Sequence, residues 1–240
     1  MIMLYQFRPL WGLPSASPFC MKVETYLRMA GLPYEVVRRA DIRKAPKGKF
    51  PYIEDHGRHI ADSRFIIDYL KSTYGNALDA ALSPAQRAMA LGLQRLMEEH
   101  LYWAVVHDRW AVRAHWEVTR RAIFGFLPVV VRRMIAQMMR KKALAQLYGH
   151  GMGRHDSEEI YALARQDLDA LADFLGDKPF FMGETPTSLD ATAFAFLASL
   201  LAPPFDSPLK AHARLLPRLT RYVERMAGKY FPDAGRPAAA

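Results

Sequence analysis

Residues 49–63 have the sequence KFPYIEDHGRHIADS and carry the clearest structural signals in this chain of 240 residues. Two short strands are expected at 52–54 and 59–61, because Gly57 between them suits the tight turn of a hairpin. Pro51 stands at the start of the first strand, one of the few places in a sheet that tolerates proline. The segment therefore predicts a strand, a turn and a second strand that leads into Ser63.

A helix is predicted to begin at Ser63 and to end at Gly75, because apolar residues recur between them at helical spacing. Ser63 is the expected N-cap, whose hydroxyl accepts a backbone N–H. A helix start also carries unpaired N–H groups and partial positive charge, which suit a carboxylate. Asp62 adds a negative charge that suits an ammonium, so the pair can bind the zwitterion of an amino acid. The alternative is a capped helix without a ligand.

The beginning of the chain predicts a β-α-β unit. A strand is expected at 3–7, a helix from Ser17-Pro18 to just before Gly31, and a second strand at 34–38. Such a unit favours a right-handed crossover between parallel strands. After a loop at 41–49 with at most one helical turn, the hairpin and its helix follow, so the predicted order is βαβ and then ββα.

Everything after a linker at 76–82 is predicted to be helical. Ser83 and Gln86 form a capping box, and Thr187 with Asp190 resembles a second one. An apolar stripe at helical spacing consists of Met89, Leu93, Met97, Leu101 and Val105. Further helices are expected on either side of Pro128, at 160–175, from 188 to Pro203, and at 217–226. The predicted domains are residues 1–75 and 83–240, joined by the linker.

The composition is that of a soluble globular protein, with 51% hydrophobic and 24% charged residues. The longest apolar run, 122–131, is far shorter than the roughly 20 residues that cross a bilayer. The first residues lack the basic segment of a secretory signal. A single cysteine, Cys20, cannot form an internal disulfide, which fits a reducing compartment, so we expect a cytoplasmic protein.

The net charge of +9 is concentrated between residues 101 and 155. This segment carries ten Lys and Arg residues against two acidic residues, Asp108 and Glu117. Such a stripe can face nucleic acid or an anionic membrane, although a solvated helix face is the more common case. We do not expect a nucleic-acid partner, because the segment carries no recognised nucleic-acid-binding motif.

Four motifs in this order resemble those of the soluble glutathione transferases. The sequence Ser-Pro-Phe-Cys at 17–20 is similar to the helix-opening motif of the tau and omega classes. The stretch 46–53 resembles the loop that leads to their cis proline, and Asp62-Ser63 resembles the acidic-Ser pair that contacts the γ-glutamyl group. Gly183 with residues 187–190 resembles their helical-domain capping motif. The resemblance implies a thioredoxin-like α/β N-terminal domain followed by an all-α C-terminal domain.

The resemblance also implies a role for the start of the first helix. The nucleophile would be the thiolate of glutathione, and a helix N-terminus lowers the pKa of a nearby thiol. Ser17 would donate its hydroxyl to that sulfur, with Ser15 as the other candidate and simple capping as the alternative. Cys20 is expected to be an inert core residue, although a mixed disulfide with glutathione is the other reading.

The remaining glutathione contacts follow from the same likeness. Pro51 would be cis and would turn the backbone of Phe50 toward the cysteinyl part of glutathione. Lys49 would pair with the glycyl carboxylate, unless it is an ordinary solvated lysine. Asp62 and Ser63 would hold the γ-glutamyl end. No metal is expected, because the histidines lack ligand spacing.

Three functions remain open at this stage, of which the third is a glutathionyl-disulfide reductase that acts through Cys20. The first is a glutathione transferase that joins the thiolate to a small hydrophobic electrophile and acts as a homodimer. The Asp62-Ser63 pair and the general sequence most resemble those of the metaxin-like and Fax-like branch of the family. The second function is therefore a non-catalytic glutathione-binding or scaffold protein, whose basic stripe docks a partner or a membrane surface.

Overall fold

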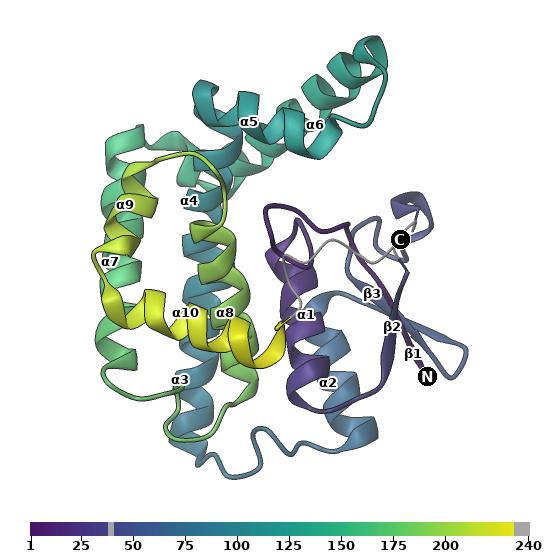
Figure 1. The fold of residues 1–240 in the computed structure, drawn as a ribbon, viewed down its shortest axis with the longest axis vertical. Coiled ribbons are helices and arrows are strands. Elements are labelled where there is room, and N and C mark those ends of the chain that lie inside the picture. Colours follow the sequence, from purple (N-terminus) through teal and green to yellow (C-terminus); the bar gives the residue numbers. More distant parts are fainter. Residues whose placement is uncertain (38–40, 233–240) are drawn as a thin grey trace.

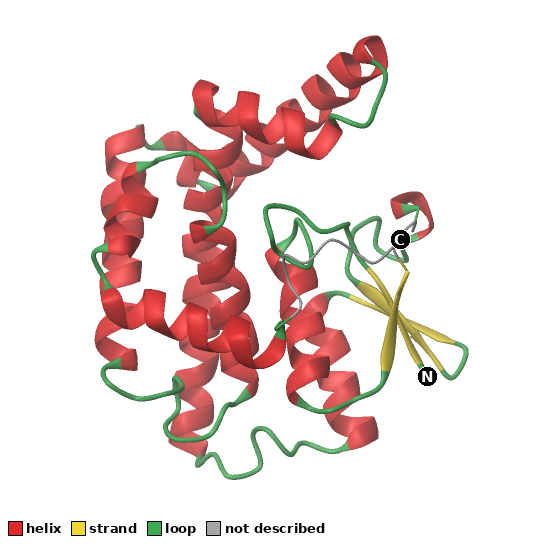
Figure 2. Ribbon diagram, viewed as in Figure 1, coloured by secondary structure: helices red, strands yellow, loops and turns green. Residues whose placement is uncertain are grey.

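A computed structural model describes residues 1–37 and 41–232. A small sheet with two helices lies beside a larger bundle of helices, as predicted (Figures 1 and 2). The last residue of the strand predicted at 34–38, and the end of the predicted domain 83–240, lie outside the described residues.

The sheet has four strands: β1 (Ile2–Tyr5), β2 (Tyr34–Val37), β3 (Tyr52–Asp55) and β4 (Arg58–Ala61). Their order is β2-β1-β3-β4, with β1 and β2 parallel and the other two pairs antiparallel. The turn between β3 and β4 places His56 and Gly57 at positive φ, as a two-residue hairpin turn requires. The predicted βαβ-ββα order is therefore confirmed.

Two helices, α1 (Pro18–Met29) and α2 (Ser63–Tyr74), pack against one face of this sheet (Figure 1). The buried cluster between them combines apolar side chains of the sheet and of both helices, such as Leu4, Val23 and Ile66. One turn of 3₁₀ helix, η1 (Ile42–Lys44), interrupts the loop after β2. Strands β1 and β4 end at the same edge of the sheet, because β3 is antiparallel to both of them. Helix α1 follows β1 and α2 follows β4, so both helices begin beyond this edge.

The helical part begins with one long, nearly continuous helix that contains two π-helical turns. Its segments are α3 (Pro84–Arg95), η2 (Leu96–Leu101), α4 (Tyr102–Val106) and η3 (His107–Ala111). The capping box of Ser83 and Gln86 is present, as predicted. Four members of the predicted apolar stripe are buried, but Met89 is half exposed.

The later elements are α5 (Arg113–Phe124), α6 (Val129–His150), η4 (Met152–Arg154), α7 (Ser157–Leu175), α8 (Ser188–Leu201), α9 (Pro208–Arg214) and α10 (Pro217–Tyr230). The sequence analysis did not predict α9, and the helix expected at 217–226 runs on to Tyr230. The break at Pro128 and the end of α7 before Gly176 are as predicted.

Helix α8 is the buried centre of the molecule and packs against both α1 and α10 (Figure 1). Asp190 in its first turn is fully buried and accepts hydrogen bonds from the backbone N–H groups of Phe181 and Thr187, at 2.9 and 2.8 Å. The hydroxyls of Thr187 and Tyr222 donate to the same carboxylate. The next residue, Ala191, belongs to the cluster under the sheet, so this cap holds the two parts of the molecule in register.

We predict that Asp190→Ala lowers the free energy of unfolding by more than about 3 kcal/mol, because several buried donors lose their acceptor at once. Urea denaturation followed by circular dichroism measures the change. Asp177→Ala is the matched control, since Asp177 is 89% exposed and should contribute less than about 0.5 kcal/mol. Equal stability of the two variants would contradict the role of this cap.

Candidate functional site

The predicted site residues converge on one edge of the sheet. Tyr5, Tyr52 and Ala61 form one row across β1, β3 and β4. Pro51 immediately precedes this row on β3, and Asp62 immediately follows it on β4. Because β3 runs antiparallel to its neighbours, its start and the ends of β1 and β4 meet at the same edge.

The loop after β1 brings Ser17 to this edge as well. The N–H of Ala16 donates to the carbonyl of Arg8 at 3.1 Å, which closes the loop just before α1. The ring of Phe7 lies 5.1 Å from that of Phe50, centroid to centroid, and Cys20 on α1 lies in the same buried cluster as Phe50. The start of α1 is thus fastened beside the segment that precedes Pro51.

Ser17 is the N-cap residue of α1, as predicted, but its hydroxyl makes no capping bond to the helix. Pro18 occupies the first helical position. Ser17 is partly exposed, whereas Ser15 is fully buried and accepts the N–H of Ser17 at 3.4 Å. Of the two hydroxyls considered for the ligand sulfur, only that of Ser17 therefore lies on an accessible side chain.

Cys20 is buried in a small cluster with Ala45, Phe50, Tyr52 and Ala61, which confirms its interpretation as a core residue. Burial raises the pKa of its thiol to about 11. A buried, protonated thiol is a poor nucleophile.

We predict that Ellman's reagent does not modify Cys20 in the folded protein at pH 8 but modifies it fully in guanidinium chloride. The thiolate is the reactive form, and with a pKa of about 11 it becomes abundant only as the pH approaches that value. Absorbance of the released thionitrobenzoate measures the reaction. One equivalent released within minutes by native protein at pH 8 would contradict this burial.

The peptide bond between Phe50 and Pro51 is cis, as predicted. Phe50 is buried, while Lys49 is exposed. The ammonium of Lys47 lies 4.3 Å from the centre of the Phe65 ring in the first turn of α2. The loop before β3 therefore lies against the start of α2.

The sequence prediction for the cap of α2 was wrong by one residue. Asp62 is the N-cap, and its carboxylate accepts the N–H of Arg64 at 3.0 Å, whereas Ser63 is the first residue of the helix and is buried. Both residue types are strong N-caps, so the pattern alone could not choose between them. The turn out of β4 decides the cap, because it puts Asp62 at a φ of 78°.

This backbone conformation is unusual for a residue other than glycine and costs about 1–3 kcal/mol. Such strain is typical of functional sites. Asp62 is also exposed, and one of its two carboxylate oxygens accepts the N–H of Arg64.

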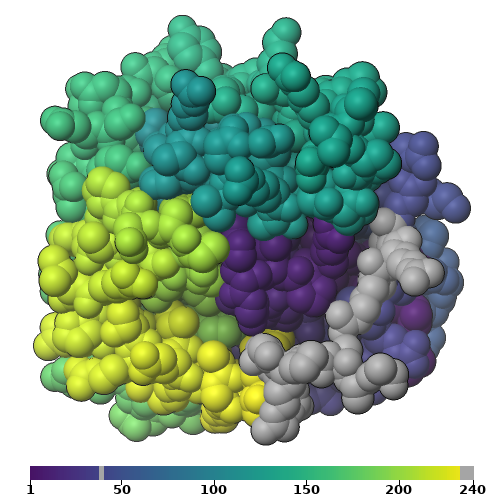
Figure 3. Space-filling view, turned by 45° about the horizontal axis from the view of Figure 1, so that its top comes forward, coloured from purple at the N-terminus to yellow at the C-terminus, as the bar shows by residue number. Residues whose placement is uncertain are grey.

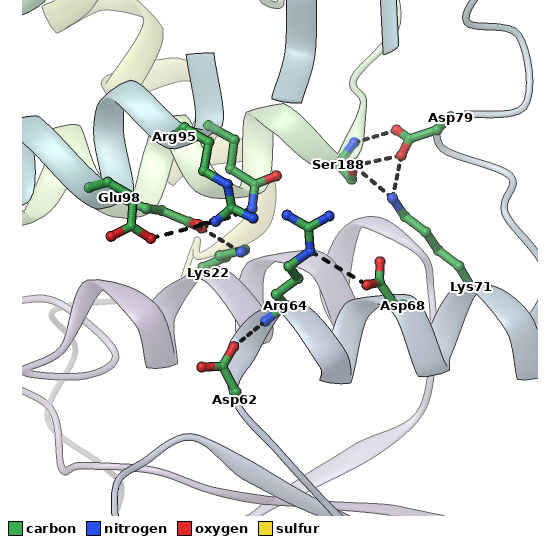
Figure 4. A network of polar contacts seen from close by, with 11 residues as sticks. Lys22, Asp62, Arg64, Asp68, Lys71, Asp79, Arg95, Glu98 and Ser188 are labelled. Atoms are coloured by element: carbon green, nitrogen blue, oxygen red, sulfur yellow. Dashed lines mark hydrogen bonds and ion pairs between the residues drawn. The ribbon is translucent and has the colours of Figure 1, made fainter. Parts of the chain in front are cut away.

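A charged cleft of about 190 Å³ lies beside the start of α2, between α2, the loop before α3, α3 itself and the start of α8 (Figure 4). Arg64 extends across it and lies 3.7 Å from the carboxylate of Asp68. At one end, Lys71 contacts Asp79 at 2.5 Å and also reaches Ser188.

The other end of the cleft holds a buried ion pair that the sequence analysis missed. Lys22 on α1 donates to Glu98 on η2 at 2.5 Å, and both side chains are almost fully buried. Gln94, one turn earlier, donates to both oxygens of Glu98. This pair ties α1 to the long helix, and a lysine inside an apolar helix face was the only sign of it in the sequence.

The described residues contain neither a cluster of side chains suited to a metal ion nor a helix long and apolar enough to cross a bilayer.

The chain was compared with known protein families and structures. Family models match residues 18–116 as a glutathione S-transferase N-terminal domain and residues 164–226 as a glutathione S-transferase C-terminal domain. The isoprene-epoxide–glutathione S-transferase of Rhodococcus sp. strain AD45 is 36% identical over an alignment of 244 positions, gaps included, which covers 96% of this chain and 99% of that protein. The chain belongs to the glutathione S-transferase family.

Other known proteins also resemble this chain along most of its length. Failed axon connections of Drosophila melanogaster is 38% identical over 97% of this chain, and human metaxin-1 is 33% identical over 94%. The chain spans 58% and 50% of the length of these two relatives. A glutathione S-transferase of Ceriporiopsis subvermispora, solved with glutathione, shares the fold over 99% of both chains, with a TM-score of 0.69 at 17% identity.

Proposed function

We propose that this member of the family is a glutathione transferase, which binds glutathione at the described edge of the sheet and joins its sulfur to a hydrophobic electrophile. The observation that carries the proposal is the meeting of three features there: the start of α1 at Ser17, the cis bond before Pro51, and the strained cap at Asp62. The 36% identity to an isoprene-epoxide–glutathione S-transferase supports it.

Each part of the tripeptide has a proposed partner. The backbone of Phe50 hydrogen-bonds the cysteinyl residue, and Lys49 pairs with the glycyl carboxylate. The carboxylate of Asp62 binds the γ-glutamyl ammonium. The hydroxyl of Ser63 and the N–H groups of the first turn of α2 receive the adjacent carboxylate, which the partial positive charge of the helix start stabilises.

The chemical step needs a thiolate. The hydroxyl of Ser17 donates to the sulfur of glutathione beside the N-terminus of α1, and both interactions lower the pKa of the thiol because they favour its charged form. The thiolate attacks an electrophilic carbon, so a carbon–sulfur bond forms. With an epoxide, the carbon–oxygen bond breaks and the oxygen takes a proton from water.

An apolar cavity supports the choice of a hydrophobic electrophile. It measures about 210 Å³ and lies between residues 12–14, in the loop that leads to Ser17, and the helices α8 and α10. Its lining is almost free of polar side chains, with Leu13, Phe194 and Val223 among its members. We propose that apolar parts of the electrophile bind here.

We predict that Ser17→Ala lowers kcat/KM with an epoxide or an aryl halide by about 100-fold, because the thiolate loses its hydroxyl donor. The dissociation constant of glutathione should change less than threefold. The pH at which the rate is half-maximal should rise, since the thiol of bound glutathione loses a contact that lowers its pKa.

Ser15→Ala is the comparison variant, and it should keep most of the turnover because Ser15 is fully buried. Steady-state kinetics across pH give kcat/KM and the pH of half-maximal rate, and isothermal titration calorimetry gives the dissociation constant of glutathione. Wild-type turnover by Ser17→Ala would remove the assigned role.

We predict that Asp62→Asn weakens glutathione binding about tenfold in calorimetry. Asparagine can still cap α2 and tolerates positive φ, so the change removes the charge that faces the ammonium and little else. Asp68→Asn on the same helix is the control, because Asp68 is exposed and its carboxylate lies 3.7 Å from Arg64. Unchanged affinity in Asp62→Asn, with an unchanged melting temperature, would refute the proposed contact.

A second candidate function is favoured by the likeness to Failed axon connections and metaxin-1. In this case the chain binds glutathione or a partner without catalysis. Calorimetric binding of glutathione together with no turnover over a panel of epoxides, aryl halides and peroxides would support this function over the first.

We further propose a cytoplasmic homodimer. The single cysteine is a buried thiol, which fits a reducing compartment. Phe65 on α2 and Met89 and Leu91 on α3 are large apolar side chains exposed to solvent, as an unpaired interface would leave them. Sedimentation equilibrium of the purified protein, which distinguishes a monomer of 27.3 kDa from its dimer, tests the oligomeric state.

A further inference from the structure

The hairpin of α5 and α6 carries an unusual set of exposed apolar side chains. It projects from the body above the sheet part in Figure 1. Most of it lies in residues 117–163, between the two segments that the family models match. Apolar side chains that are more than 60% exposed gather near its tip: Phe126, Val129, Val130, Met134 and Met138.

This exposure does not come from a loosely packed helix. The inner side of the hairpin has its own buried cluster of Trp116, Phe124 and Ala136. Arg140 on α6 donates to the backbone carbonyls of Trp110 and Ala111, at 2.8 and 3.0 Å. The hairpin is therefore a packed element with one face buried and the other in solvent.

The exposed apolar residues form a continuous stripe. Val130, Met134 and Met138 follow one another at intervals of four residues, so they lie on one face of α6. Phe126 and Val129 extend this face to the tip. Exposed apolar patches of this kind mark interaction sites, because leaving them in water is unfavourable.

The hairpin that carries this stripe is also rich in cations. On α6, Arg133, Lys141 and Lys142 are exposed and Arg132 is half-buried, and α5 adds Arg121. Within the part of the chain that the structure describes, none of these five side chains forms an ion pair, and the hairpin has a single one, between Arg120 and Glu117. The face thus combines unneutralised positive charge with exposed aliphatic side chains.

We propose that this hairpin docks on an anionic lipid surface. The stripe from Phe126 to Met138 enters the boundary between headgroups and acyl chains, while Arg133, Lys141 and Lys142 bind the headgroup phosphates. A second copy of the chain does not suit the face, because it would bring two strongly positive surfaces together. The stripe is also largely aliphatic, whereas proteins that bind single-stranded nucleic acids present aromatic side chains on which the bases stack.

The docking face lies close to the candidate site. Arg8, in the loop that leads to Ser17, donates to the carbonyl of Ile123 at 2.7 Å, and its guanidinium lies 3.9 Å from the centre of the Phe126 ring. Figure 3 shows the hairpin in teal against the purple N-terminal segment. A protein held by this hairpin would therefore keep the loop before Ser17 near the lipid. The docking itself does not depend on glutathione binding or on catalysis.

Sedimentation with sucrose-loaded vesicles tests the proposal on the full chain. We expect at least tenfold stronger binding to vesicles of phosphatidylcholine with 30% phosphatidylserine than to phosphatidylcholine alone, and weaker binding as salt is raised. The double variant Lys141→Glu/Lys142→Glu should lose at least tenfold in affinity. Its matched control, Arg214→Glu/Arg221→Glu, reverses two exposed arginines on α9 and α10 and should bind like the wild type.

A second variant, Met134→Ser/Met138→Ser, separates insertion from simple charge attraction. Both side chains are exposed, so the fold should be kept, and circular dichroism checks this. Binding to anionic vesicles at 0.15 M salt should fall at least fivefold. Wild-type affinity in this variant would overturn insertion of the stripe. Absence of vesicle binding, or equal binding to neutral vesicles, would overturn the proposed docking on an anionic lipid surface and would leave a protein as the partner.

Discussion

The buried carboxylate of Asp190 is the interaction on which the arrangement of the two parts depends. It accepts backbone N–H groups from Phe181 and Thr187 and the hydroxyl of Tyr222, so three segments meet at one group. Burial raises its pKa, and the hydrogen bonds counter this by stabilising the charged form. Because this carboxylate fixes the start of α8, it also fixes the surface against which α1 packs, and Ser17 stands at the start of α1.

At the candidate site, the edge of the sheet brings together unusual backbone conformations rather than several charged side chains. The cis bond at Pro51 and the positive φ of Asp62 lie beyond the same end of the row formed by Tyr52 and Ala61. A peptide ligand needs backbone partners in a fixed position, and strained or cis residues supply them only where the surrounding packing holds them. The cluster of Cys20, Phe50 and Tyr52 beneath the edge provides that packing.

The charges of the molecule are arranged differently in its two polar regions. In the cleft beside α2, Lys22 is paired with Glu98 and Lys71 with Asp79, and these pairs connect elements. On the α5–α6 hairpin they are largely unpaired and border exposed apolar side chains. Paired charges contribute to the architecture, whereas unpaired ones produce a long-range field that acts on a partner.

The sequence by itself determined the features that arise from neighbouring residues: the hairpin turn, the capping boxes, and the helix starts at Pro18 and Pro84. Only the tertiary structure decided that Asp62 rather than Ser63 caps α2, since the end of β4 sets the backbone there. The pairing of Lys22 with Glu98, 76 positions apart in the sequence, also depends on the tertiary structure. The same is true of the division of α6 into an exposed apolar stripe and a buried side. Local preferences act over a few residues, whereas burial and long-range pairing depend on which elements the whole chain brings together.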